Sequence, residues 1–401
     1  MKKRLMLFVI SVAMCMMSVL FVDARAQKPW TVLVYMTASF EKAPYAFLNI
    51  REMAHVGSND MVNILVYLTI EEKKGVTKTK KLYIEKGKAR QIGSSMVRDS
   101  GDVATFMEAV QWSAVDYPSD HSAIVIWDRA GDAEYKTVYR SAVKNICYSD
   151  STDRSLSDYD FVNVLSWVKD NVRGGVPFDI IAFDTSFLAT IEMAYAFSSC
   201  AHYYVASQDS ISIDGFQYAS WLRSLSVNRL VPAEVVARLV TTYDQEYSLD
   251  DFTSLSVVDL SLLSLLVNNI NAVSCVLASL LEEKHFEENK HIIKKCVNKN
   301  LCFSFDGHRY IDIKNFYKNI LKYSINFHMS LFTLHKFHNL LNDGLSLFPL
   351  VVKKRVLGKK SKDVGGLSVY FSRYSIDQLY YGLYWSKNNA DWLFFLEKYI
   401  V

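Results

Sequence analysis

The chain has 401 residues, half of them hydrophobic and 22% charged, with a net charge of +3. This composition is that of a folded protein with a large core and excludes a disordered chain, and the length suits one large α/β unit with additions or two domains. Because basic and acidic residues nearly balance, the charge also argues against a nucleic-acid-binding protein.

The N-terminal segment has the pattern of a secretory signal peptide. Residues 2–4 are basic, residues 5–22 are apolar apart from two serines, and Ala24-Arg25-Ala26 supplies the small-x-small cleavage pattern. We therefore expect cleavage near Ala26–Gln27 and a secreted or periplasmic bacterial protein; an uncleaved anchor is the alternative. The nearest later apolar run, residues 260–281, is interrupted by asparagines, so no membrane span is expected after signal removal.

Between residues 27 and 230, buried strands alternate with helices. Apolar runs predict core strands at 30–37, 61–70, 121–128, 178–184 and 202–207. Helical patterns predict helices at 45–56, 102–115, 155–172 and 187–199, and residues 81–85 suit a hairpin. This alternation predicts an α/β fold with an open, largely parallel sheet flanked by helices.

Residues 231–401 form a mainly helical C-terminal part. Helices are predicted at 232–247, 260–286, 310–323, 329–341 and 392–399. Strands are predicted at 253–259, 345–352 and 366–371, and we expect them to return to the core. The chain thus divides into a signal peptide (1–26), an α/β core (27–230) and the helical part (231–401).

Five cysteines follow the predicted signal peptide, without a CxxC pair. Their spacing demands no disulfide framework. Cys296 and Cys302 are close enough in sequence to pair, but buried thiols suit them equally well. No HExxH, Walker loop or GxGxxG indicates a metal or nucleotide site, and no cofactor is expected.

The carboxyl ends of the predicted strands gather charged and hydroxyl residues. In open parallel sheets ligands bind at this edge. Asp128 and Arg129 end one strand, Asp184 and Ser186 the next, and Asp209 a third. These five residues form the candidate site.

The segments around these strand ends resemble the clostripain family of cysteine peptidases. Residues 124–129 resemble the family strand that ends in Trp-Asp-His-Gly, and residues 183–188 resemble its Phe-Asp-Ala-Cys-Leu-Met segment. Segments 30–36, 50–53, 117–121, 191–195, 205–209, 366–370 and 392–399 agree in order and spacing. The resemblance implies a caspase-like fold.

The resemblance also implies a Cys nucleophile and a His base at adjacent strand ends. This sequence has Arg129 at the His position and Ser186 at the Cys position, with Ala130 and Thr185 replacing a flanking Gly and Ala. An arginine, with a pKa above about 12, accepts no proton at neutral pH, and a serine without a base is a poor nucleophile. We therefore expect a catalytically inactive homologue, a pseudopeptidase with a binding or regulatory role.

In the resembling enzymes, acids near Asp184 and Asp209 line a pocket for Arg or Lys. A peptide or protein ligand with basic side chains is therefore expected, with Asp128 as a third acid around Arg129. The alternative is that Asp184 simply pairs with Arg129. Calcium is a further expectation from the family alone.

Two other functions stay open. One is an active endopeptidase cleaving after Arg or Lys with a rearranged site, and the other is a binding protein that uses Arg129 for an anionic ligand. His121 is not expected to serve as the base, because it lies eight residues before Arg129, about 26 Å away along the strand.

Overall fold

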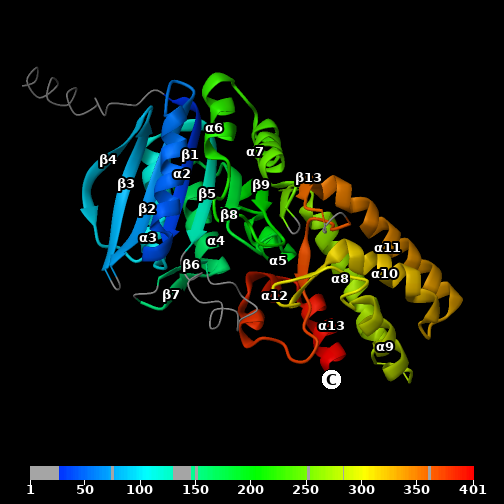
Figure 1. The fold of residues 1–401 in the computed structure, drawn as a ribbon. Helices are drawn as coiled ribbons and strands as arrows, with labels where there is room; N and C mark the ends of the chain where they lie inside the picture. Colours follow the sequence, from blue (N-terminus) through cyan, green and yellow to red (C-terminus); the bar gives the residue numbers. More distant parts are fainter. Residues whose placement is uncertain are drawn as a thin grey trace, which may run out of the picture.

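The computed structural model describes residues 27–73, 76–129, 146–149, 152–250, 253–282, 284–359 and 363–401. Its largest sheet, at the centre of Figure 1, has nine strands. They follow one another across the sheet as β13 (Val352–Leu357), β10 (Ser254–Asp259), β9 (Ala201–Ala206), β8 (Phe178–Asp184), β5 (Ser119–Arg129), β1 (Lys28–Ala38), β2 (Val62–Lys73), β3 (Val76–Glu85) and β4 (Lys88–Met96).

The middle of this sheet is parallel. Strands β2, β1, β5, β8 and β9 pair in parallel, whereas β3, β4, β10 and β13 join antiparallel at the two sides. All seven residues of β8 are buried, as a strand covered on both faces requires. The predicted fold class, a caspase-like α/β sheet flanked by helices, is confirmed.

Helices cover both faces because successive side chains of each strand point to opposite sides. On β1, Val32 packs with α2 (Ala43–Val56), α6 (Tyr218–Val227) and α7 (Pro232–Tyr247). The next residue, Leu33, packs with α3 (Val103–Asp116), α4 (Asp158–Asn171) and α5 (Ile191–Phe197). The remaining short elements here are η1 (Phe40–Lys42), β6 (Ile146–Ser149) and β7 (Arg154–Leu156).

The C-terminal part adds helices beyond β10. They are α8 (Leu263–Leu280), α9 (Phe286–Cys296), α10 (Ile313–Tyr323), η3 (Ser324–Asn326), α11 (Leu331–Val351), η4 (Gln378–Gly382), α12 (Tyr384–Asn388) and α13 (Ala390–Ile400). A small sheet contains β11 (Ser304–Phe305), β12 (Tyr310–Asp312) and β14 (Ser368–Tyr370). Within the described residues, α8 alone is long and apolar enough to cross a membrane, but 56% of its span is buried in the fold.

Two buried carboxyl groups tie this helical part to the core. Asp312 accepts hydrogen bonds from Gln208 Nε2 at 3.0 Å and from the backbone N–H of Gly365 at 2.7 Å. Glu192 of α5 accepts from the N–H of Tyr370 at 2.9 Å and from the Tyr380 hydroxyl at 3.0 Å. Burial raises the pKa of Glu192 to about 7.

Four predicted boundaries are wrong. Residues 345–351 belong to α11 rather than to a strand, because Leu341, Gly344, Phe348 and Val351 are buried at alternating three- and four-residue spacing. The predicted helix at 260–286 ends at Leu280, and α9 follows as a separate helix. Residues 310–312 form β12, and the helix after β8 begins only at Ile191, which Thr190 caps.

The five cysteines in the described residues are free thiols, and both Cys296 and Cys302 are buried. Burial raises the pKa of Cys296 to about 12, so this thiol stays protonated at neutral pH. The structure therefore does not indicate a reactive thiolate at Cys296.

Candidate functional site

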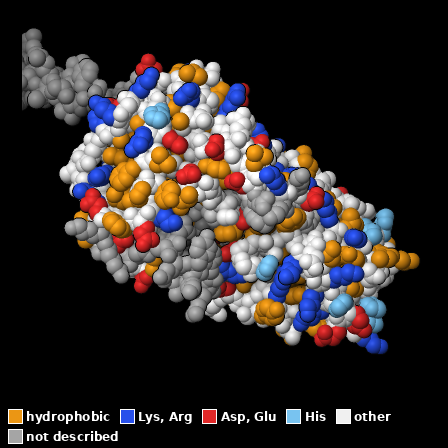
Figure 2. All heavy atoms as spheres, in the orientation of Figure 1, with side chains coloured by type: hydrophobic (Ala, Val, Ile, Leu, Met, Phe, Trp, Pro, Cys, Tyr) orange, Lys and Arg blue, Asp and Glu red, His pale blue; other side chains and the backbone are white. Residues whose placement is uncertain are grey.

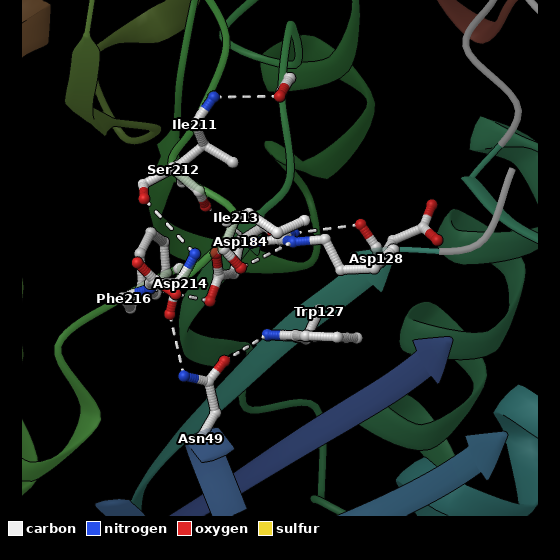
Figure 3. A network of polar contacts seen from close by, with 12 residues as sticks. Asn49, Trp127, Asp128, Asp184, Ile211, Ser212, Ile213, Asp214 and Phe216 are labelled. Carbon is white, nitrogen blue, oxygen red and sulfur yellow. Dashed lines mark hydrogen bonds and ion pairs between the residues drawn. The ribbon is translucent and has the colours of Figure 1, made fainter. Parts of the chain in front are cut away.

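The carboxyl ends of β5 and β8 lie side by side. Trp127 pairs with Asp184 in the parallel register, so Arg129 extends just beyond the end of β8. Figure 3 shows the segment after β9, from Ile211 to Phe216, running beside these two ends. The strand ends and this segment together define the candidate site.

Arg129 is buried, with 2% of its surface exposed, and forms an ion pair with Asp184 at 2.9 Å. A guanidinium has five N–H groups, and the described residues supply five acceptor contacts. The acceptors are the Asp184 carboxylate and the backbone carbonyl groups of Asp128, Asp184, Ser212 and Ile213. The guanidinium also lies 4.8 Å from the centre of the Trp127 ring. The chain itself therefore saturates the donors of Arg129.

Asp184 is equally enclosed, with no exposed surface. One carboxylate oxygen accepts from Arg129, and the other accepts from the N–H of Phe216 at 3.0 Å and the hydroxyl of Tyr218 at 2.9 Å. Burial, and then the charge of Asp184, raise the pKa of Tyr218, which keeps this hydroxyl protonated as a donor. The expected alternative, in which Asp184 pairs with Arg129, is thus present in the structure.

Gly215 lets the segment after β9 approach Asp184 closely. Its φ is +72°, and a Cβ at this position would lie 2.6 Å from Asp184 Oδ2. Such a separation is a clash, and the backbone conformation itself favours glycine. The glycine is therefore required for the ion pair to be covered.

A second contact fixes the same segment from α2. Asn49 accepts from Trp127 Nε1 at 2.7 Å and donates to the carbonyl of Asp214 at 2.9 Å, as Figure 3 shows. Sequence reasoning missed Asn49. The available signal is a polar side chain on the buried stripe of a helix, between Ala46 and Met53.

Of the three carboxylates expected around Arg129, the described structure shows an ion pair from Asp184, while Asp128 and Asp209 accept other hydrogen bonds. Asp128 accepts from the Thr37 hydroxyl at 3.0 Å and from the N–H of Cys147 at 2.9 Å, and its carboxylate points away from Asp184 in Figure 3. Asp209 accepts from the N–H of Ser210 at 2.7 Å, and burial raises its pKa. Within the described part of the chain, Asp184 provides the one ion pair to Arg129.

Ser186 is partly exposed, in the turn after β8. Its Oγ accepts from the N–H of Ile211 at 3.0 Å. The next residue, Phe187, has a φ of +63°, and its N–H donates to the carbonyl of Asp209 at 3.1 Å. Thr185 is buried, and Ala130 lies outside the described residues. The hydroxyl is thus held by the same segment that covers Asp184.

All nine histidines lie in described parts of the chain. His121 is near the start of β5, at the edge opposite Arg129, where it contacts Asp179 at 3.0 Å. His202 is near the start of β9, His55 is in the last turn of α2, and the other six lie between residues 285 and 338. None of them follows the carboxyl end of β5, β8 or β9.

The described residues contain no group of three or more His, Cys, Asp or Glu side chains arranged to hold a metal ion. The calcium expectation therefore stays a prediction from the family resemblance.

Residues 34–346 match the model of the clostripain family. The chain belongs to the clostripain family. No curated protein sequence matches it. Two solved structures of C11 proteases, each from a bacterium, have the same fold, and each match covers more than 90% of this chain.

One is an inactive zymogen C11 protease from Parabacteroides distasonis, with 19% identity and a TM-score of 0.63, covering 91% of this chain and 99% of that one. The other is a secreted C11 cysteine protease from Bacteroides thetaiotaomicron in complex with an irreversible peptide inhibitor. It has 18% identity and a TM-score of 0.60, covering 92% and 99%. At these identities the likeness establishes the fold.

We predict that Arg129→Ala lowers the melting temperature much more than Ser186→Ala does. Removing one partner of a buried ion pair leaves the other charge uncompensated, at a cost of about 3–5 kcal/mol. Losing the hydrogen bond to Ser186 costs about 1 kcal/mol. Thermal unfolding of the two variants measures the difference. The double variant Arg129→Met with Asp184→Asn removes both charges and should regain part of the loss; small, equal shifts would contradict a structural role for Arg129.

We also predict that Gly215→Ala destabilises the protein by at least about 2 kcal/mol, through strain and the clash with Asp184. Gly174→Ala is the matched control, because Gly174 has a φ of +62° but open space where a Cβ would lie. Chemical denaturation of both variants separates the clash from the backbone strain. If the two substitutions cost the same, the close approach to Asp184 is not the reason for the glycine.

Proposed function

We propose that this clostripain-family chain is an exported protein without peptidase activity, whose fold serves binding or regulation. One observation carries the proposal: at the position where the family resemblance puts the catalytic histidine, the chain has a buried arginine with all its donors engaged. A guanidinium with a pKa above about 12 is a poor proton acceptor, so it cannot replace an imidazole as general base.

Ser186 supports the same proposal. At the nucleophile position it supplies a hydroxyl in place of a thiolate, and a serine hydroxyl needs a neighbouring base to attack a peptide carbonyl. The adjacent strand end offers Arg129 instead. The two substitutions together remove the acceptor and the sulfur nucleophile.

The alternative of an active endopeptidase with a rearranged site has less support. Recognition of a substrate's Arg or Lys by Asp184 needs a free carboxylate, but both oxygens already accept hydrogen bonds from the chain. The alternative of an anionic ligand held by Arg129 meets the same difficulty, because its five N–H groups are engaged. Each alternative would require the covering segment to move away.

A peptide or protein ligand with basic side chains remains the proposed partner. The partly exposed Asp209 and the exposed Asp214 support it, since both lie in the segment beside Ser186. The secreted bacterial C11 protease among the similar structures supports export, as does the predicted signal peptide.

The protein is expected not to hydrolyse peptides after Arg or Lys. Fluorogenic Arg- and Lys-site peptides, assayed with calcium and reductant, provide the measurement. Turnover would contradict the proposal, and the variant Ser186→Ala would then show where it arises: turnover lost in this variant identifies Ser186 as the nucleophile, and turnover retained places it elsewhere.

Reversion provides the complementary control. Arg129→His with Ser186→Cys restores the two residue types at adjacent strand ends but should regain at most weak activity, because catalytic geometry tolerates little displacement. A fourfold variant that adds Ala130→Gly and Thr185→Ala should react better. The readout is thiol-dependent cleavage, or labelling at position 186 by an Arg chloromethylketone. A folded fourfold variant no more reactive than wild type would refute the assignment of these strand ends as the ancestral active site.

The mature protein is expected to begin at Gln27. Intact mass and N-terminal sequencing of protein from the native host test this start, and a cyclised Gln27 would appear as loss of ammonia. A mass that includes residues 1–26 would show that the chain stays anchored.

A further inference from the structure

The hairpin of α10 and α11 reaches away from the main sheet. Since α11 ends at Val351, next to the start of β13, its first residue lies about 30 Å along the helix axis from that strand. Figure 1 shows this end of α11 at the extremity of the molecule. Between α10 and α11 the chain forms η3 and a short linker.

Three apolar side chains are exposed at this end within eight residues. Ile325 is 66% exposed, Leu331 81% and Phe332 69%. The buried stripe of α11 begins only at Leu334, so these three side chains contribute little to the core. Single exposed apolar residues are ordinary, but a cluster at a projecting end indicates a surface that meets something else. We call Ile325, Leu331 and Phe332 the hairpin tip.

The part of the chain that contains the hairpin tip is rich in positive charge. Residues 284–336 contain nine lysines and one arginine against two glutamates and two aspartates. Lys336 lies 4.2 Å from the centre of the Phe332 ring, and Lys295 of α9 lies 4.1 Å from that of Tyr323. Figure 2 shows lysine and arginine side chains spread over this end, with hydrophobic side chains at its extremity.

These charges are not neutralised within the fold. Lys294, Lys295, Lys322 and Lys336 are exposed, and none forms an ion pair with any other described residue. A lysine that keeps its charge in water while its alkyl stem lies against an aromatic ring can serve both an apolar and an anionic neighbour. The surface thus combines the apolar hairpin tip with exposed lysines that form no ion pair. We call Lys294, Lys295, Lys322 and Lys336 the basic collar.

We propose that the hairpin tip docks on an anionic lipid surface. Leu331 and Phe332 enter the boundary between headgroups and acyl chains, and the surrounding lysines bind the anionic headgroups. Charge complementarity between the lysines and anionic headgroups favours a lipid surface, because a purely apolar partner would leave the basic collar without counter-charges. The projecting shape favours it as well, since a membrane surface can meet a convex tip without a matching groove.

The test is co-sedimentation of the chain with vesicles of phosphatidylcholine alone or of phosphatidylcholine mixed with phosphatidylglycerol. Wild type and variants carry the same N-terminus, so any contribution of that segment cancels. Wild type should bind the mixed vesicles at least about tenfold more tightly than the neutral ones, and high salt should weaken the binding. Binding to neither kind of vesicle, or equal binding to both, overturns the proposal.

Leu331→Ser with Phe332→Ser, and separately Lys322→Glu with Lys336→Glu, should each reduce binding to mixed vesicles at least about tenfold. Phe47→Ser with Leu48→Ser is the apolar control, because it removes another exposed Phe–Leu pair, from α2. Lys86→Glu with Lys387→Glu is the charge control, with the same change in net charge at exposed sites elsewhere.

Thermal melts confirm that all four double variants are folded. Tip variants that bind like wild type, or controls that lose as much binding as the tip variants, contradict docking through this surface.

Discussion

The buried ion pair between Arg129 and Asp184 governs the edge of the sheet where β5 and β8 end. Taking both charges out of water is costly, and their attraction offsets that cost only when the remaining donors and acceptors are satisfied. Here the main chain supplies most of the acceptors for Arg129, and Phe216 and Tyr218 supply donors to Asp184. Residues 212–216 must therefore follow a path that brings these donors and acceptors to the ion pair. That path also brings Gly215 close to Asp184.

The pairing with Asp184 gives Arg129 two chemical effects. A side chain that cannot accept a proton takes the position proposed for the base, and it also occupies the carboxylate that a basic substrate side chain would need. In the proposed function, Arg129 therefore accounts both for the missing catalytic base and for the loss of Asp184 as a partner for a basic substrate side chain. The partly exposed Asp209 and the exposed Asp214 lie outside the pair, so they are acidic groups that a ligand could still reach.

The sequence predicted the architecture well where apolar runs are continuous. The five parallel strands are buried on both faces, and such strands are recognisable without knowledge of their neighbours. It failed at residues 345–351, where a short apolar run with Pro349 suited a strand as well as a helix. The pairing of Arg129 with Asp184 was foreseen as one of two alternatives, because parallel strand ends meet at one edge. The contacts from Ser212, Ile213 and Asn49 were not predicted, because they depend on the path of a loop that no local sequence pattern specifies.

The saturation of the strand-end site also bears on where this protein can bind. A ligand that competes for Arg129 must replace five acceptor contacts that the chain already provides. One that competes for Asp184 must replace three donor contacts to its carboxylate, and a buried charge left unpaired in exchange opposes either. A surface whose charges have no internal partner requires no such exchange. In the described structure the exposed Lys322 and Lys336 form no ion pair and meet this condition, so in the proposed docking their attraction to anionic headgroups adds to the free energy of association directly. In the proposed lipid docking, association at the projecting helical end therefore breaks no contact within the fold, whereas association at Arg129 or Asp184 does.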